Sequence, residues 1–110
     1  MKKGPHNKEK IEAVNPLPGI YRKTLSYNDN VMLCHFLLEA DAKIPLHDHD
    51  AHQIGYVISG KIKFLTETRG NFIAEAGDSY VFDGMEKHGA EIIETAEVIE
   101  VFSPTREEYK

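Results

Sequence analysis

Short apolar segments, separated by turn-forming residues, run through most of the 110-residue chain. Residues 61–64 alternate polar and apolar side chains with a period of two, which is typical of a strand with one buried face. Residues 31–39 are apolar almost throughout, which favours a strand buried on both faces or at an interface. The predicted strands are residues 21–25, 31–39, 54–58, 61–66, 72–75, 79–82, 90–94 and 97–102. This regular spacing predicts an all-β domain, either a sandwich or a small barrel.

The chain divides into three parts along its length. Residues 1–19 form a polar arm that ends in the turn-rich stretch Asn-Pro-Leu-Pro-Gly, and within this arm only residues 8–14 have a pattern compatible with a helix. Residues 20–103 carry the predicted strands, and residues 104–110 form a short C-terminal tail. Because 110 residues is the size of one domain, we expect a single domain.

Charge and composition exclude several classes of protein. Thirteen Lys and Arg against eighteen Asp and Glu give a net charge of −5, which argues against nucleic acid as a partner. No apolar run approaches the roughly 20 residues of a membrane span, and no apolar segment follows the basic start as it would in a secretory signal. The single cysteine, Cys34, rules out an internal disulfide and fits a reducing cytoplasm. We therefore expect a cytoplasmic protein with neither a nucleic-acid nor a membrane partner.

Three of the six histidines lie in the heptapeptide 47–53. In an extended strand His47, His49 and Gln53 share one face, whereas His52 lies on the other. Neutral imidazole is a preferred ligand of Fe, Ni, Cu and Zn, and an amide oxygen is a weaker and harder one. The alternative is a polar loop with ordinary solvated histidines, because so short a motif also occurs by chance.

A further histidine, His88, follows a turn later in the chain. By itself it reads as an ordinary exposed residue. In a barrel, however, a downstream strand can lie beside the first one, so that His88 would complete a set of four ligands.

These spacings resemble those of the cupin family. The first cupin motif is matched by His47, His49, Gln53 and Gly60, with Gln53 where most cupins carry Glu. The second is matched in a degraded form by Gly77, Asp83, Met85 and His88. The resemblance covers residues 20–103 and implies a double-stranded β-helix, which is a jelly-roll barrel. It also implies that one divalent transition metal (Zn, Ni, Fe or Mn) is bound by His47, His49, Gln53 and His88.

Such a ligand set has chemical consequences. Three neutral imidazoles and a neutral amide leave the charge of a dication uncompensated, which favours an anionic ligand such as a carboxylate or enolate. Four protein ligands on an octahedral metal leave two adjacent open positions, so a substrate can chelate the metal. The metal would then act as a Lewis acid and as a template.

The C-terminal segment adds two further candidates. Glu100 lies among the apolar residues of 97–102, and burial there would raise its pKa and suit it to proton transfer. On the solvent face it would be an ordinary glutamate. Arg106 could bind a substrate carboxylate with two hydrogen bonds, or it could be one more charge in an acidic tail.

This segment resembles the small cupins of pectin and alginate breakdown, which convert 4,5-unsaturated uronates into open-chain keto-uronates. The resemblance rests on an acidic residue, a phenylalanine two positions on, and Ser-Pro-x-Arg. It implies catalytic roles for Glu100 and Arg106 and substrate binding by Phe102 and Arg106. The sequence departs from the pattern at Glu100, where these proteins carry the shorter Asp.

Three functions are compatible with these residues. The leading hypothesis is a metal-dependent isomerase that opens the ring of an unsaturated uronate, a small anionic substrate. The alternatives are a cupin dioxygenase, which needs redox-active metal and oxygen, and a non-catalytic module that binds or senses a sugar acid. The resemblance also implies a homodimer, for which the apolar segment 31–39 is a candidate edge strand.

Overall fold

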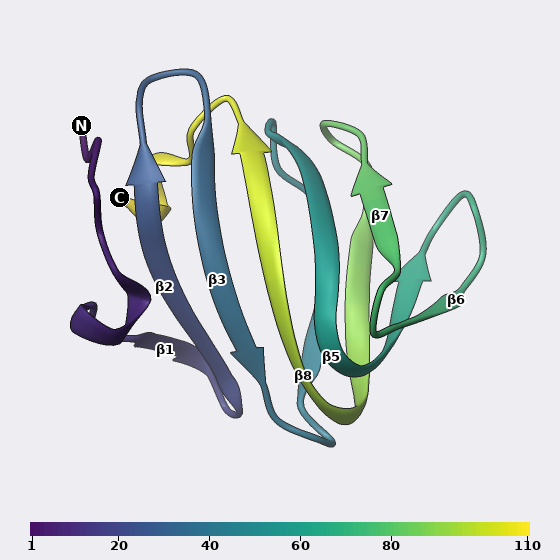
Figure 1. The fold of residues 1–110 in the computed structure, drawn as a ribbon. Coiled ribbons are helices and arrows are strands. Elements are labelled where there is room, and N and C mark those ends of the chain that lie inside the picture. Colours follow the sequence, from purple (N-terminus) through teal and green to yellow (C-terminus); the bar gives the residue numbers. More distant parts are fainter.

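The computed structural model describes all 110 residues and confirms the all-β fold class (Figure 1). Eight strands form one sheet. In chain order the elements are η1 (Lys8–Lys10), β1 (Val14–Leu17), β2 (Ile20–Tyr27), β3 (Met32–Leu38), β4 (Lys43–His47), β5 (His52–Thr66), β6 (Phe72–Glu75), β7 (Ser79–Phe82), β8 (His88–Ser103) and η2 (Glu107–Tyr109), where η denotes a 3-10 helix.

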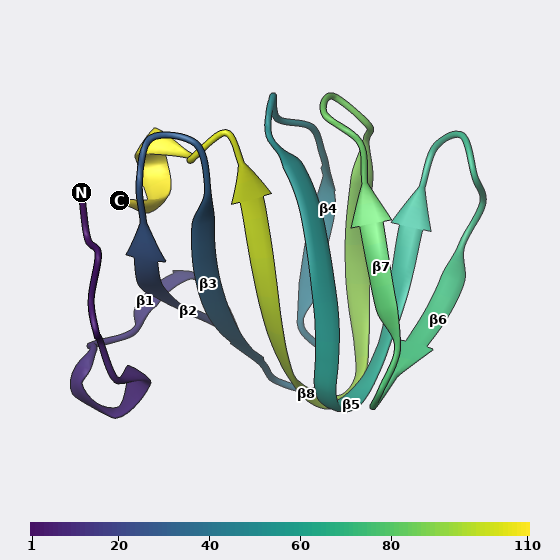
Figure 2. The ribbon, with the colours of Figure 1, turned by 45° about the horizontal axis from the view of Figure 1, so that its top comes forward.

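The sheet is antiparallel and curls around a common interior (Figures 1 and 2). Its main order is β1-β2-β3-β8-β5-β6, with β4 also paired to β8 and β7 also paired to β5. The long strands β5 and β8 pair with each other along most of their length. Each therefore serves two parts of the barrel: β8 joins β3 with one half and β4 with the other, and β5 does the same for β7 and β6.

The bend in these two strands is located at Gly60. The β5–β8 register shifts between Val57 and Lys61, and Gly60 has a φ of +90°. A Cβ atom there would overlap with the carbonyl oxygen of Thr95 and the Cα of Ala96, so only glycine fits the crossing. The prediction of separate strands at 54–58 and 61–66, and at 90–94 and 97–102, is therefore wrong: each pair is one bent strand.

The interior of the barrel contains both aromatic and polar side chains. Aromatic rings fill one part, with Phe64 4.4 Å from Tyr80 and 5.4 Å from Phe82 between ring centres. Polar side chains that are nevertheless buried include Arg22, Gln53, His88 and Glu100. Because buried polar groups are costly unless they are partnered, these four residues point to the functional part of the barrel.

Two further expectations are corrected by the structure. Residues 8–14 do not form a helix beyond the single 3-10 turn at Lys8–Lys10, and Val14–Leu17 instead pairs with β2 as strand β1. Strand β3 lies between β2 and β8, so residues 31–39 are not an edge, and burial in the sheet explains their apolar character. No helix of the structure has the length and apolarity that a membrane crossing requires.

Candidate functional site

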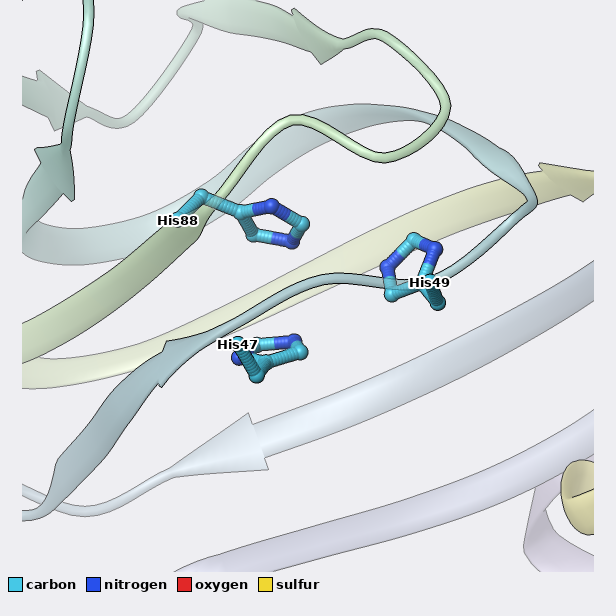
Figure 3. A group of neighbouring side chains, drawn as sticks. All are labelled: His47, His49 and His88. Carbon is cyan, nitrogen blue, oxygen red and sulfur yellow. The ribbon is translucent and has the colours of Figure 1, made fainter.

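Three histidines converge at one end of the barrel. His47 ends β4, His88 begins β8, and the β4–β8 register places them opposite each other. His49 lies in the loop between β4 and β5, so the residues from 47 to 53 are not the continuous strand that the argument from alternation assumed. The ligand nitrogens of the three rings nevertheless lie within 4.8 Å of one another, and Figure 3 shows the rings turned toward a common space.

Backbone carbonyl groups fix the orientation of two of these rings. Nδ1 of His47 donates to the carbonyl oxygen of Pro45 at 2.9 Å, and Nδ1 of His88 donates to that of Glu86 at 2.8 Å. Each ring therefore carries its free lone pair on Nε2. The Phe82 ring stacks on His88 at 4.2 Å between centres and limits its rotation. Two of the three imidazoles are thus oriented as ligands by the protein itself.

Gln53 completes the group, which is called the histidine cluster below: His47, His49, Gln53 and His88. The amide nitrogen of Gln53 donates to Oε2 of Glu100 at 2.6 Å, so the amide oxygen of Gln53 must face the histidine rings. That oxygen is 3.0 Å from Nε2 of His49 and 3.2 Å from Nε2 of His88. In His88 an acceptor oxygen thus faces an acceptor nitrogen, an arrangement that is repulsive alone and becomes favourable with a cation between them.

The third ring and the charge state of the cluster also fit a metal ligand set. Nδ1 of His49 is buried and has no hydrogen-bond partner, so no protein donor engages either nitrogen of this ring. Burial lowers the pKa of His49, and it lowers the pKa of His88 to about 4. The two imidazoles are therefore neutral at ordinary pH, which is the form that binds metals. Imidazole and amide ligands suit several divalent transition metals, so the set does not select among them.

Glu100 lies beside the cluster and is buried, 6% exposed, rather than on the solvent face. Its Oε2 atom accepts hydrogen bonds from the amide of Gln53 and from the hydroxyl of Tyr80, each at 2.6 Å. Burial raises the pKa of Glu100, although these two hydrogen bonds and the charge of Arg106 oppose the change. The carboxyl group therefore binds a proton more readily than an exposed glutamate.

Gly55 makes the contact between Tyr80 and Glu100 geometrically feasible. In the sheet Gly55 is paired with Tyr80 on one side and with Glu100 on the other. A Cβ atom at this position would overlap with the Tyr80 ring. Because glycine has no side chain, the tyrosine can lie across β5 and reach the carboxylate.

A cavity of about 250 Å³ connects these groups. Its lining includes His47, Gln53, His88, Glu100, Phe102 and Arg106 together with apolar residues of β2, β3 and β4. The Phe102 ring is 5.9 Å from the His49 ring, and the guanidinium carbon of Arg106 is 5.3 Å from the centre of Phe102. The structure therefore brings six of the seven predicted site residues to one cavity, and His49, which is outside its lining, contacts Phe102 and the other histidines.

Arg106 takes part in both arrangements that the sequence left open, the substrate cavity and the acidic tail. It lines the cavity, and its Nε also donates to the exposed carboxylate of Glu108 in the acidic tail at 2.8 Å. Its guanidinium carbon lies 4.0 Å from the ring centre of Tyr109, in η2 at the same end of the barrel as the β2–β3 turn (Figure 2). The tail therefore forms part of the cavity wall.

Three polar side chains of the cavity were missed by sequence reasoning: Arg22, Tyr80 and Tyr109. Tyr80 shares its strand face with Phe82, and this parity was a usable signal. Arg22 lies on the same strand face as the buried Ile20, so a charged residue at an inward-facing position could have indicated a cavity residue. Tyr109 gave no signal, because its position depends on how the tail folds over the barrel.

The histidines outside the cluster have other contacts. His35 forms a 2.7 Å ion-pair contact with Glu97, and Nδ1 of His52 accepts the backbone N–H of Gly84 at 3.0 Å. Neither contact involves the cavity.

Known proteins match the chain over most of its length. Residues 34–102 match the family model of the cupin domain. The pectin degradation protein KdgF of Dickeya dadantii (strain 3937) is 34% identical over 94 residues, which are 83% of this chain and 84% of that protein. The structure of an RmlC-like cupin from Shewanella frigidimarina NCIMB 400 is 26% identical, with a TM-score of 0.90 and complete coverage of both chains. The structure of KdgF from Halomonas sp. is 27% identical, covers 96% of this chain and 98% of its own, and has a TM-score of 0.88.

Proposed function

The chain belongs to the cupin family, and we propose that it is a metal-dependent enzyme that opens the ring of a 4,5-unsaturated uronate. The relation to a pectin degradation protein supports a sugar acid as substrate. The observation that carries the proposal is the position of Glu100, a buried carboxyl hydrogen-bonded to Gln53 of the histidine cluster inside one cavity. An acid–base group and a metal ligand set are thus directly connected.

The histidine cluster would hold the metal through three imidazole nitrogens and the amide oxygen of Gln53. When bound, a divalent metal would supply Lewis acidity toward the oxygens of the sugar acid. Gln53 has a second task, because its amide nitrogen holds Glu100 in place. In the proposed enzyme one side chain therefore links metal binding with the proton-transfer group.

Ring opening of this substrate is an isomerisation in which all atoms are conserved. The anomeric hydroxyl loses its proton, the bond between the anomeric carbon and the ring oxygen breaks, and the ring oxygen takes up a proton, so that the products are an aldehyde and an enol. The enol becomes a ketone when its hydroxyl proton is lost and a proton is added to carbon 4. Glu100 would accept and return these protons, and burial, which raises its pKa, makes it a better proton acceptor than an exposed glutamate. Tyr80, whose pKa burial raises well above the ordinary value, stays protonated and keeps the carboxyl oriented.

Arg106 and Phe102 would position the substrate. The guanidinium can donate two parallel hydrogen bonds to a carboxylate, and Arg106 is close enough to the cavity to do so. The Phe102 ring, 1% exposed, forms an apolar floor between Arg106 and the histidine cluster. A sugar acid would therefore bind across Phe102.

An ultraviolet assay tests this function. Metal-loaded protein should bleach the enol-ether absorbance of unsaturated galacturonate faster than buffer alone. The Glu100→Gln variant is the matched control, because both hydrogen bonds end on one oxygen of Glu100, and an amide oxygen can accept them. We expect its rate to fall by about 10²- to 10⁴-fold. Equal rates for the two proteins would refute the role of Glu100.

The same samples separate the other two functions. A dioxygenase would consume oxygen in proportion to the substrate, which an oxygen electrode measures. A binding module would return the sugar acid chemically unchanged. We propose the isomerase over both, because a buried acid–base group beside the ligand set has no use in simple binding.

A homodimer is also part of the proposal. The outer face of the barrel exposes apolar side chains of neighbouring strands, and Ile54 of β5 is paired with Val81 of β7 and Val101 of β8. Tyr56, also exposed, continues this face. An apolar sheet face of this kind suits a two-fold interface. Sedimentation should show a dimer for the wild type and a monomer for Ile54→Lys; a monomeric wild type would refute it.

A further inference from the structure

Arg22 is a buried cation to which the protein gives no hydrogen-bond acceptor. It lies on the inner face of β2, is 8% exposed and lines the cavity. Its Nε atom is buried without a hydrogen-bond partner, and no carboxylate lies within ion-pair distance of its guanidinium. Buried charges are normally paired, and arginine is almost never fully buried otherwise. The partner of Arg22 is therefore missing from the protein.

An aromatic ring lies against this guanidinium. The guanidinium carbon of Arg22 lies 4.0 Å from the ring centre of Tyr109, the same distance as that of Arg106. The two guanidiniums, called the arginine pair below, are therefore at most twice this distance apart. A ring face attracts a cation but does not accept the hydrogen bonds that the edge of a guanidinium can donate.

Glu100, the acidic residue that lines the cavity, is not paired with either arginine. Glu100 forms its hydrogen bonds with Gln53 and Tyr80, and no oxygen of it is within ion-pair distance of either arginine. Arg106 has a carboxylate partner, Glu108, but that partner is exposed and uses only one nitrogen. Both cations thus have free donors, and no carboxylate that lines the cavity is paired with either of them.

We infer that Arg22 and Arg106 together form a carboxylate-binding site, and that Arg22 makes the cavity select sugar acids over their neutral counterparts. This inference rests on the proposed substrate class. The carboxylate of a uronate would accept hydrogen bonds from the free donors of the arginine pair, while the sugar ring extends over Phe102 toward the histidine cluster. Binding of the acid would then supply the partner that Arg22 lacks.

The competing explanation is that Arg22 only supports the Tyr109 ring. The two explanations differ in what they predict for charged and neutral ligands. A supporting residue would affect acid and neutral sugar alike, because both need the same cavity wall. A carboxylate-binding residue would affect only the acid.

Calorimetric titration of the full-length, metal-loaded protein separates these explanations. The probes are D-galacturonate, its methyl ester and D-galactose, none of which contains the double bond needed for ring opening. We expect the wild type to bind the acid at least about tenfold more tightly than the ester, which is the usual effect of a charge-assisted hydrogen bond. In Arg22→Met this preference should shrink by about tenfold, with the affinities for ester and galactose unchanged.

Three results would overturn the inference. These are an undiminished acid preference in Arg22→Met, an equal loss for acid and ester, and no binding of galacturonate by the wild type. If Arg22→Met does not fold, Arg22→Lys serves in its place, because it keeps the charge, loses the planar fork, and should reduce the acid preference by a smaller factor.

The outcome is independent of the proposed catalysis. An acid preference carried by Arg22 without bleaching of the unsaturated substrate would refute the enzyme and keep the binding site. Bleaching by a protein whose acid preference does not depend on Arg22 would keep the enzyme and refute the binding site.

Discussion

The histidine cluster and the arginine pair face the same cavity but are built in different ways. Within the cluster, Pro45 and Glu86 carbonyl groups orient His47 and His88, and Glu100 orients Gln53. The arginine pair rests on an aromatic ring, and only Arg106 has a carboxylate partner. The protein therefore orients His47, His88 and Gln53 with its own hydrogen bonds, whereas it offers Arg22 no hydrogen-bond acceptor.

The organised side should be the more sensitive to packing changes. In Gly55→Val the new side chain would collide with the Tyr80 ring and displace the tyrosine hydroxyl from Glu100. We expect the free energy of unfolding to fall by about 3 kcal/mol, as for an overpacked core, and the bleaching rate to fall with it. Urea denaturation and the ultraviolet assay measure these two effects.

A double variant provides the control for this prediction. Gly55→Val combined with Tyr80→Ala removes the collision, so stability should recover in part while the bleaching rate stays low. Galacturonate affinity should change little in either variant, because the arginine pair is not touched. A Gly55→Val protein as stable and active as the wild type would show that Tyr80 and Glu100 are not organised as described.

The two sides also differ in how well the sequence predicts them. His47, His49 and Gln53 lie within seven residues, so a local motif grouped them although His49 is in a loop rather than in the strand that alternation assumed, and only His88 required the fold. The arginine pair joins β2 to the tail, and no local pattern records which strand the tail will cover. Long-range contacts of this kind depend on register and packing, which a single sequence does not display.

The fold was predictable to a similar degree. Most strand positions followed from alternation and turn residues, although β1 and β4 were not among the predicted strands, and the all-β fold class was right. Gly60 was interpreted as the end of a strand, whereas it lies in a bend within one strand. A glycine in a strand sequence can mark either a turn or a close approach to a neighbouring strand, and the sequence alone does not distinguish the two. Strand β1 was missed because Pro16 argues against a strand, although an edge strand such as β1 tolerates it.

The buried thiol of Cys34 tests how far the charge of the arginine pair is felt in the core. Burial raises its pKa from the ordinary 9.0 to about 11, and the charge of Glu100 adds to this increase, although the Thr24 hydrogen bond and then Arg22 and Arg106 oppose it. Because the unfolded thiol ionises first, stability should fall by about 2 kcal/mol as the pH rises from 9 to 11. Below pH 9 the thiol is protonated in both states and makes no such contribution.

Comparison with Cys34→Ala isolates this effect in urea titrations across the same pH range. The wild type should lose more stability than the variant by the amount given. Parallel curves would mean that the thiol ionises at its ordinary pKa, and hence that the Thr24 hydrogen bond and the charges of the arginine pair together offset burial more strongly than the structure implies.

A smaller effect is expected at the aromatic support of the arginine pair. Tyr109→Leu keeps an apolar side chain but removes the ring on which both guanidiniums rest. We expect a loss of about 1 kcal/mol in stability, typical of a cation–π contact, and weaker binding of galacturonate. Metal content should stay unchanged, since the histidine cluster is not involved.

The matched control is Tyr109→Phe, which keeps the ring and removes only the hydroxyl. It should behave like the wild type in calorimetric titration and thermal unfolding. If Phe weakens binding as much as Leu, the hydroxyl rather than the ring supports the arginine pair.

The central claim is that His47, His49, Gln53 and His88 form one metal site, and elemental analysis of untagged protein tests it most directly. The wild type should contain one divalent transition metal per chain. A His6→Ala, His52→Ala variant should keep that metal, because both residues lie outside the cluster, whereas His47→Ala, His88→Ala should lose it. Equal metal in the wild type and the His47→Ala, His88→Ala variant would contradict the account.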